Sequence, residues 1–380
     1  MTATIFHLLH NQWTLREEQP QVDADKCQLV LCFASTEILS APNIYQSVKE
    51  KFKHAQIAMC STAGEIFHDT VQEESLVAAA ICFEKTATET AQVNIRDFEN
   101  SYEAGKALVG KLCKDDLTYV MVLSDGSLVN GSELVKGLND AVENRILITG
   151  GLAGDGDKFK TTLVGLNEQP AQGNIAAIGF YGSHLKVVHG SNGGWQTFGL
   201  EKEVTLSAGN KLFELDSNNA LDIYKKYLGQ EADNLPGSAL MFPLSVTIPG
   251  SPQPVVRTIL GISHEENSMT FAGDIPAGSK VRFMKANFDM LTSSASIAAQ
   301  NTLHQSAEAP DFSLLVSCVG RKIILGPRIE EELEAVAESL GNNTPFAGFY
   351  SYGEIAPFNG ETDCQLHNQT MTVTSFYELP

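Results

Sequence analysis

Two histidines stand in settings that could place an imidazole on a metal. His189 ends the apolar run LKVVH before the glycine-rich turn GSNGGW (190–195), and His367 lies in LHNQTM just before the last apolar run. Imidazole is the commonest metal ligand in proteins, and a haem pocket combines an axial donor with apolar walls, to which Trp195 would contribute. A single histidine is more often a hydrogen-bonded structural residue. Both interpretations therefore apply to each position.

A second pair of features consists of two similar loops that carry carboxylates. STAGEI (61–66) and SYGEI (351–355) each follow an apolar run. If the chain has two related halves, these loops would line one shared pocket. The other interpretation is that each glutamate satisfies backbone donors in its own turn. The candidate pocket residues of the two loops are Cys60, Glu65, Tyr350, Tyr352 and Glu354.

Motifs of common enzyme classes are missing from the sequence. There is no GxxxxGK[ST], HExxH, GxSxG or GxGxxG, and the turn GGLAGDG (150–156) lacks the lysine of a nucleotide-binding loop. The adjacent Cys60 and Ser61 could be nucleophiles of a hydrolase or transferase, but the sequence identifies no base beside them. We therefore expect a binding protein and not an enzyme.

The elements that must position these residues alternate between strands and helices. Apolar runs at 28–35, 76–84 and 118–126 are typical of buried strands, and 101–113 and 328–341 have helical spacing. Asn130, with Glu133 three residues later, predicts the start of a further helix. This alternation predicts an α/β fold with α+β character, in which helices pack on mixed sheets. We place a domain boundary near 200, which divides the chain into 1–200 and 201–380.

Composition excludes several classes of partner. The net charge is −20, so the surface repels nucleic acid and anionic membranes. No apolar run is long enough for a membrane helix, and the first residues lack the pattern of an export signal. Seven cysteines occur without a CxxC pair, which fits a reducing compartment. We expect a cytoplasmic protein.

Several motifs together resemble the FIST family. They are MCSTAGEI (59–66), SDGSLVNG, GGLAGDG and the C-terminal run from SCVGRKIILGPR through PFAGFYSYGEIAP to LHNQTMTVT. The resemblance covers roughly 28–378. It implies a FIST N-terminal domain (1–200), a FIST C-terminal domain (201–380) and possible pseudo-symmetry between two mixed-sheet halves. It also implies a bacterial sensory module for a small ligand.

Other segments resemble the nitric-oxide-sensing haem proteins of this class, called NosP. The segments are HGSNGGWQTFG (189–199), 206–229 and LPGSALMFPL (235–244). This resemblance implies haem b with His189 as the first choice of axial ligand and His367 as the second, and nitric oxide as the signal. Arg321 and Arg328 would then meet the propionates. The implied partner is a histidine kinase or hybrid kinase of a two-component system, and oligomerisation is possible. The alternative is a non-haem FIST sensor of a small molecule such as an amino acid.

Overall fold

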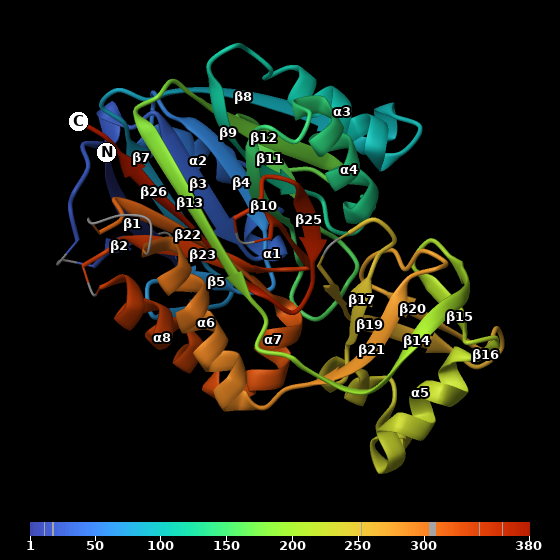
Figure 1. The fold of residues 1–380 in the computed structure, drawn as a ribbon. Coiled ribbons are helices and arrows are strands. Elements are labelled where there is room, and N and C mark those ends of the chain that lie inside the picture. The colour runs from blue at the N-terminus through green and yellow to red at the C-terminus, as the bar shows by residue number, and fades with distance from the viewer. Residues whose placement is uncertain (11, 17–18, 252, 304–308, 342, 359) are drawn as a thin grey trace.

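Three consecutive segments repeat one arrangement of strands in the computed structural model, which describes all residues except 11, 17–18, 252, 304–308, 342 and 359 (Figure 1). The first segment contains β1 (Thr2–Leu9), β2 (Gln12–Leu15), β3 (Leu29–Ala34), α1 (Thr36–Leu39), α2 (Ile44–Lys51), β4 (Gln56–Ser61), β5 (Glu65–Phe67), β6 (Thr70–Gln72) and β7 (Leu76–Cys82). The second contains β8 (Ala87–Asn94), α3 (Ser101–Gly110), β9 (Leu117–Ser124), α4 (Gly131–Val142), β10 (Leu147–Leu152), β11 (Val164–Leu166) and β12 (Asn174–Tyr181). The third contains β13 (Leu185–Asn192), α6 (Phe288–Leu303), β22 (Phe312–Cys318), α7 (Val319–Leu325), α8 (Glu330–Leu340), β23 (Phe346–Ser351), β24 (Gly353–Pro357), β25 (Cys364–His367) and β26 (Met371–Glu378).

Each segment builds its own sheet and borrows one or two strands from another segment. The centre of each sheet is a parallel pair joined through helices: β3 with β4, β9 with β10, and β22 with β23. The last strand of each segment (β7, β12 or β26) pairs antiparallel with the first strand of this parallel pair. The first strand of the segment (β1, β8 or β13) pairs antiparallel with that last strand. The first sheet borrows β11, the second borrows the pair β24 and β25, and the third borrows the pair β5 and β6. This cyclic exchange joins the segments into one pseudo-threefold unit, called the body below.

The inner faces of the three sheets form a shared core. Phe33 of the first segment stacks on Phe349 of the third, with ring centroids 5.0 Å apart. Tyr119 of the second packs edge-on against Phe376 of the third at 5.6 Å. Every residue of β3 and of β22 is buried, which explains why these runs are continuously apolar or small. Contacts between segments therefore hold the body together.

Helices cover the outer faces of the sheets. The side chain of Asn130 accepts hydrogen bonds from the backbone N–H groups of Ser132 and Glu133, so α4 begins where its sequence predicts. Leu134 and Leu138 of α4 are fully buried against the second sheet. In the third segment, α6 and α8 pack against each other on the outside of the body (Figure 1).

Between β13 and α6 the chain forms a separate, mainly β domain, called the inserted domain (196–285). It contains β14 (Gln196–Ala208), β15 (Lys211–Leu215), β16 (Asn218–Asn219), α5 (Ala220–Leu228), β17 (Leu244–Thr247), β18 (Val255–Arg257), β19 (Ile259–Ser263), β20 (Ser268–Phe271) and β21 (Lys280–Lys285). These strands form one sheet with its own apolar core. The domain lies to one side of the body and joins it through two neighbouring crossings (Figure 1).

The structure confirms an α/β fold of mixed sheets with packed helices. The repeat is threefold, so the two similar loops have a third counterpart. Residue 200, the predicted boundary, lies within β14, the first strand of the inserted domain. The chain leaves the third segment shortly before this strand and returns to it at α6. None of the described helices is both long enough and apolar enough to cross a membrane.

Candidate functional site

The loops after β4, β10 and β23 meet at the pseudo-threefold axis. They follow the second strand of each parallel pair, so the fold brings them to one end of the body. Each loop donates a backbone hydrogen bond to the strand end of another segment. The bonds run from Ala63 N to Tyr350 O at 2.8 Å, from Gly154 N to Ser61 O at 2.9 Å, and from Tyr352 N to Leu152 O at 3.1 Å. The structure therefore brings the STAGEI and SYGEI loops together, with the GGLAGDG turn as the third member.

Glu65 and Glu354 occupy similar positions in two of these loops. Glu65 accepts hydrogen bonds from the hydroxyls of Thr62 (2.6 Å) and Ser75 (3.0 Å). Glu354 accepts them from Ser351 (2.9 Å) and from the hydroxyl of Thr370 (2.7 Å). Burial raises the pKa of each carboxyl to about 7, although these hydroxyls oppose the shift. Both side chains satisfy local donors, and Glu354 is fully buried.

Asp155 and Tyr352 connect the third loop to its neighbour. The hydroxyl of Tyr352 donates to the Asp155 carboxylate, and burial, followed by this contact, raises the pKa of Tyr352. The ring of Tyr352 stacks on Phe159 with centroids 4.4 Å apart. Phe159 has a positive φ of 51° and is 45% exposed. The Asp155 turn therefore presents an aromatic surface beside the inserted domain.

Cys60 and Ser61 are not arranged as nucleophiles. The Cys60 side chain is buried, and burial raises the pKa of its thiol well above the usual value. Ser61 Oγ accepts the Leu163 N–H at 2.9 Å. No hydrogen bond joins either side chain to a histidine or carboxylate in the described part of the chain. Tyr350, in β23 of the third sheet, is also fully buried and donates its hydroxyl to Glu332 at 2.8 Å.

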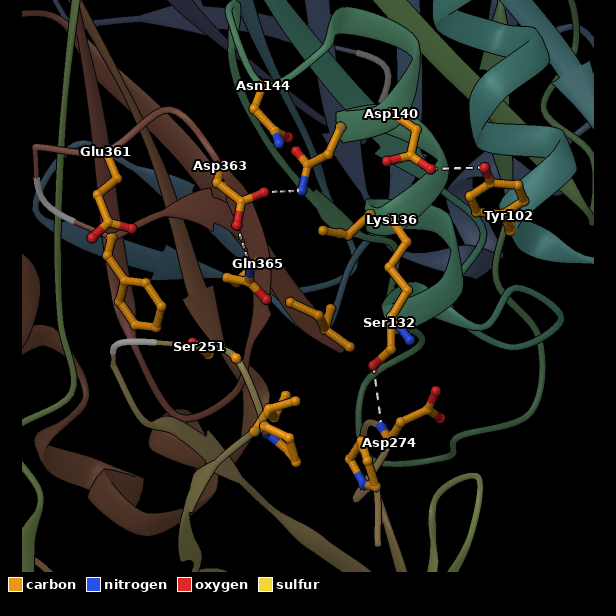
Figure 2. A pocket seen from close by; sticks show the side chains of 18 of the residues that line it. Tyr102, Ser132, Lys136, Asp140, Asn144, Ser251, Asp274, Glu361, Asp363 and Gln365 are labelled. Carbon is orange, nitrogen blue, oxygen red and sulfur yellow. Dashed lines mark hydrogen bonds between the residues drawn. The ribbon is translucent and has the colours of Figure 1, made fainter. Parts of the chain in front are cut away.

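A cleft separates the body from the inserted domain, and one cavity in it has a volume of about 470 Å³ (Figure 2). Its walls come from α3 and α4, from the β24–β25 hairpin, and from loops of the inserted domain. Polar side chains dominate the view, and Lys136 projects toward Ser132 and Asp274 (Figure 2). The charged lining residues are Lys136, Asp140, Arg257, Asp274, Glu361 and Asp363.

Arg257, the last residue of β18, is the buried cation of this cavity. It is only 2% exposed, and no described carboxylate lies within ion-pair distance of it, although the charge of nearby Asp274 opposes the fall in its pKa. Its Nε donates to Asp274 O at 3.1 Å, and its Nη1 donates to Leu366 O at 2.8 Å, across the cleft. Its Nη2 makes no hydrogen bond to a described residue. Burial lowers the pKa of the guanidinium to about 10, so the side chain stays charged at neutral pH.

Carboxylates gather in the same cavity. Asp140 accepts a hydrogen bond from the Tyr102 hydroxyl at 2.7 Å, and Asp363 accepts one from Asn139 at 2.6 Å (Figure 2). Burial raises the pKa of Asp363, and the negative charges of Glu361 and Asp140 raise it further. Repulsion among these groups decreases when a cation lies between them. The cavity therefore contains a charged arginine that can donate hydrogen bonds, together with more carboxylates than cationic side chains.

A second cavity, of about 350 Å³, lies in the same cleft and shares Asp274 with the first. Leu128, Phe159 and Leu260 line it and are each nearly half exposed. Tyr352 lines this cavity, and a further cavity of about 590 Å³ is lined by Glu65. The two loops therefore meet at the axis but contribute to different cavities.

Sequence comparison supplies the decisive observation. The chain matches the FIST N domain over residues 28–218 and the FIST C domain over 220–357. The chain belongs to the FIST family. No curated protein matches it. Two solved structures of cyanuric acid hydrolase are similar to it. The enzyme from A. caulinodans has 8% identity and a TM-score of 0.35 over 100% of this chain and 99% of its own, and the second has 10% identity and a TM-score of 0.30 over 98% and 99%.

In this FIST protein, His189 and His367 lie near each other inside the body. β13 continues to Asn192, so His189 is within the strand and not at its end. Burial lowers the pKa of His189 to about 3 and that of His367 to about 4, so both rings are neutral. Neither nitrogen of His189 makes a hydrogen bond of standard geometry, although nearby backbone groups of Pro357 and Val373 oppose the pKa shift. His367 Nε2 lies 2.9 Å from Ala356 O.

The surroundings of these histidines do not fit a haem as they are packed. Neither ring lines the cavities described above. A Cβ on Gly190 would lie 2.2 Å from Ala298 O, so α6 occupies the space expected beside His189. Trp195 donates its ring N–H to Gln369 O at 3.0 Å, which holds the turn closed.

The two arginines expected at propionates already have partners. Arg321 is fully buried in an ion pair with Glu332 at 2.7 Å. Arg328 is on the surface and pairs with Glu331 and Asp289. Among the described residues, the buried arginine that lines a cavity is Arg257, which the sequence reasoning missed. Arg257 comes shortly after a proline-rich segment (235–254). That segment has no periodic pattern from which a site could be predicted.

Proposed function

We propose that this FIST protein is a sensor whose small ligand binds in the cleft between the body and the inserted domain. The observation that carries this proposal is Arg257, a buried and charged side chain beside a cavity rich in carboxylates, whose Nη2 makes no hydrogen bond to a described residue. Buried charges are normally paired, so a bound anionic group would complete this one. The carboxylates Asp140, Glu361 and Asp363 would attract a positive group of the same molecule. A small zwitterion such as an amino acid meets both requirements.

Binding there would change the position of the inserted domain. The hydrogen bonds that cross the cleft include those from Arg257 Nη1 to Leu366 O and from Asp274 N to Ser132 Oγ. A ligand that contacts both walls favours the closed arrangement by its differential affinity for the two states. The inserted domain would then present a different surface to a partner. The family resemblance supports a separate histidine kinase as that partner.

Calorimetry and thermal shift with a panel of amino acids and related zwitterions test the proposal. We expect at least one member to raise Tm and bind the wild type at one site. Asp363→Asn should weaken that binding about tenfold, and Arg257→Gln should abolish it. Glu143→Gln, outside the cleft, is the matched control. The proposal fails if no zwitterion binds, or if cleft variants bind as tightly as the control.

Haem-dependent nitric oxide sensing is the second candidate, favoured by the neutral His189 ring with both nitrogens free of standard hydrogen bonds. It requires the packing between β13 and α6 to open. Protein mixed with hemin and passed through gel filtration should then retain stoichiometric haem whose Soret band shifts with nitric oxide. His189→Ala should lose it, and His367→Ala should lose less. Absence of retained haem rejects this candidate and leaves the first intact.

A further inference from the structure

Cys27 and Cys82 form a close thiol pair in the first segment. Cys27 follows a short 3-10 turn (Ala24–Lys26), and Cys82 ends β7. Their Sγ atoms are 3.2 Å apart, although 54 residues separate them in the chain. A disulfide bond needs the sulfurs at about 2.05 Å, which small side-chain rotations can reach from this starting distance. The two thiols are therefore near bonding geometry while reduced.

Hydrogen bonds hold the backbone on both sides of the pair. Gln28 N donates to Ile81 O at 3.2 Å, and Phe83 N donates to Gln28 Oε1 at 2.8 Å. Gln28 Nε2 returns a bond to Phe83 O at 3.3 Å. The residues next to each cysteine are thus tied to the opposite strand. The backbone that carries the two sulfurs is therefore held in place by hydrogen bonds.

We propose that Cys27 and Cys82 are an oxidisable dithiol that reacts with a hydroperoxide to form an intramolecular disulfide. Cys82, the more exposed thiol, would react first. Its thiolate attacks one peroxide oxygen, the O–O bond breaks, and the leaving hydroxide takes a proton as water. The sulfur of Cys27 then attacks the Cys82 sulfenic acid, the S–O bond breaks, and a second water leaves. Two thiols are oxidised, and one peroxide is reduced by two electrons.

The order of attack agrees with the local electrostatics. Burial raises the pKa of both thiols, so the reaction should be slow at neutral pH and faster in mild alkali. The hydrogen bond between the sulfurs opposes the shift at Cys82 and adds to it at Cys27. The disulfide would close a loop that contains β3, β4 and the STAGEI loop, and so restrict the unfolded chain.

Hydrogen peroxide treatment of the reduced full-length protein, followed by thiol blocking and peptide mass mapping, tests this assignment. We expect a product about 2 Da lighter, a peptide that links residues 27 and 82, a higher Tm, and reversal by dithiothreitol. Cys82→Ser and Cys27→Ser should both prevent the link. Cys113→Ser, which removes an exposed thiol elsewhere, should not affect it.

The proposal is overturned if no 27–82 peptide forms at a peroxide dose that oxidises Cys113. It is also overturned if Cys82→Ser still produces an intramolecular disulfide, because another pair would then be responsible. Mapping of the wild type alone decides the first outcome, so the test stands even if Cys27→Ser fails to fold. Zwitterion binding and haem retention are separate measurements, and neither result bears on the thiol pair.

Discussion

Replacing Arg321 with methionine should destabilise the body strongly. Its Nε and Nη2 contact Glu332 Oε2 at 3.0 and 2.7 Å, and both side chains are fully buried. The guanidinium also donates to Gly193 O at 3.0 Å and to Leu291 O at 2.8 Å. These two carbonyls lie near the two crossings to the inserted domain. Arg321 therefore holds both crossings against the third segment.

The magnitude follows from the charge left behind. Methionine keeps most of the apolar stem, but among the described side chains Glu332 would retain as donors only the hydroxyls of Ser317 and Tyr350. Removing one partner of a buried ion pair costs about 3–5 kcal/mol. For a unit the size of the body, with an unfolding entropy of about 2.1 cal/mol/K per residue, such a loss corresponds to a Tm decrease of roughly 5–8 °C. Replacing both charges with apolar residues, as in Arg321→Met with Glu332→Leu, should recover much of it, because no unpaired charge remains.

Thermal unfolding monitored by circular dichroism, with urea titration as a second probe, measures these differences. Arg328→Met is the matched control, because Arg328 carries the same charge in the same region but lies on the surface. It should leave Tm unchanged within error. Equal Tm values for Arg321→Met and Arg328→Met would refute the reasoning. A double variant no more stable than Arg321→Met would show that lost packing, and not the unpaired charge, is responsible.

Two more variants test the loops and the sheets. Burial raises the pKa of Glu354 to about 7, compared with about 4.3 for an unfolded glutamate. Between these pH values the folded protein keeps a proton on this carboxyl that the unfolded chain loses, so the free energy of unfolding falls as the pH rises. Glu354→Gln should therefore gain in Tm relative to wild type between pH 5 and 7.5, and a constant difference would contradict the cause given. Gly150 has a φ of 153°, and a Cβ there would lie 1.8 Å from Val122 O, so Gly150→Ala should yield insoluble protein. Gly110→Ala, with open space around the new methyl group, should remain soluble, and a soluble, native Gly150→Ala would disprove the packing argument.

Local patterns in the sequence predict much of the body. The strands, the start of α4 at Asn130 and the end of α5 at Gly229 follow from apolar spacing and capping residues. Strand exchange between segments does not, because β5, β11 and β24 are short and their partners lie far away in sequence. The likeness of STAGEI to SYGEI revealed two of three equivalent loops. The third loop, GGLAGDG, has an aspartate near the position of the two glutamates. It does not contain the sequence GEI, so sequence similarity did not reveal it.

The candidate site was harder to predict, because its residues come from unrelated segments. Arg257 lies beside Leu366 and Asp274 only after the inserted domain folds against the body. At His189 the sequence predicted a site that the fold does not form. The glycine that follows it, Gly190, suggested open space for a cofactor. In the fold that glycine permits close packing of α6. A local pattern can indicate that a backbone comes close to something, but not whether that neighbour is a cofactor or a helix.

The two candidate regions differ in how easily a ligand could change them. At the axis, three loops are joined by backbone hydrogen bonds, and Glu65 and Glu354 are satisfied by neighbouring hydroxyls. Moving any loop would break these bonds in a buried setting, which costs stability without a compensating contact. In the cleft, Arg257 has an unused donor and the carboxylates repel one another, so a ligand of matching charge removes an existing cost. If the proposed ligand binds in the cleft, it would therefore favour movement of the inserted domain over rearrangement of the axis, and the axis would serve as the fixed frame for that movement.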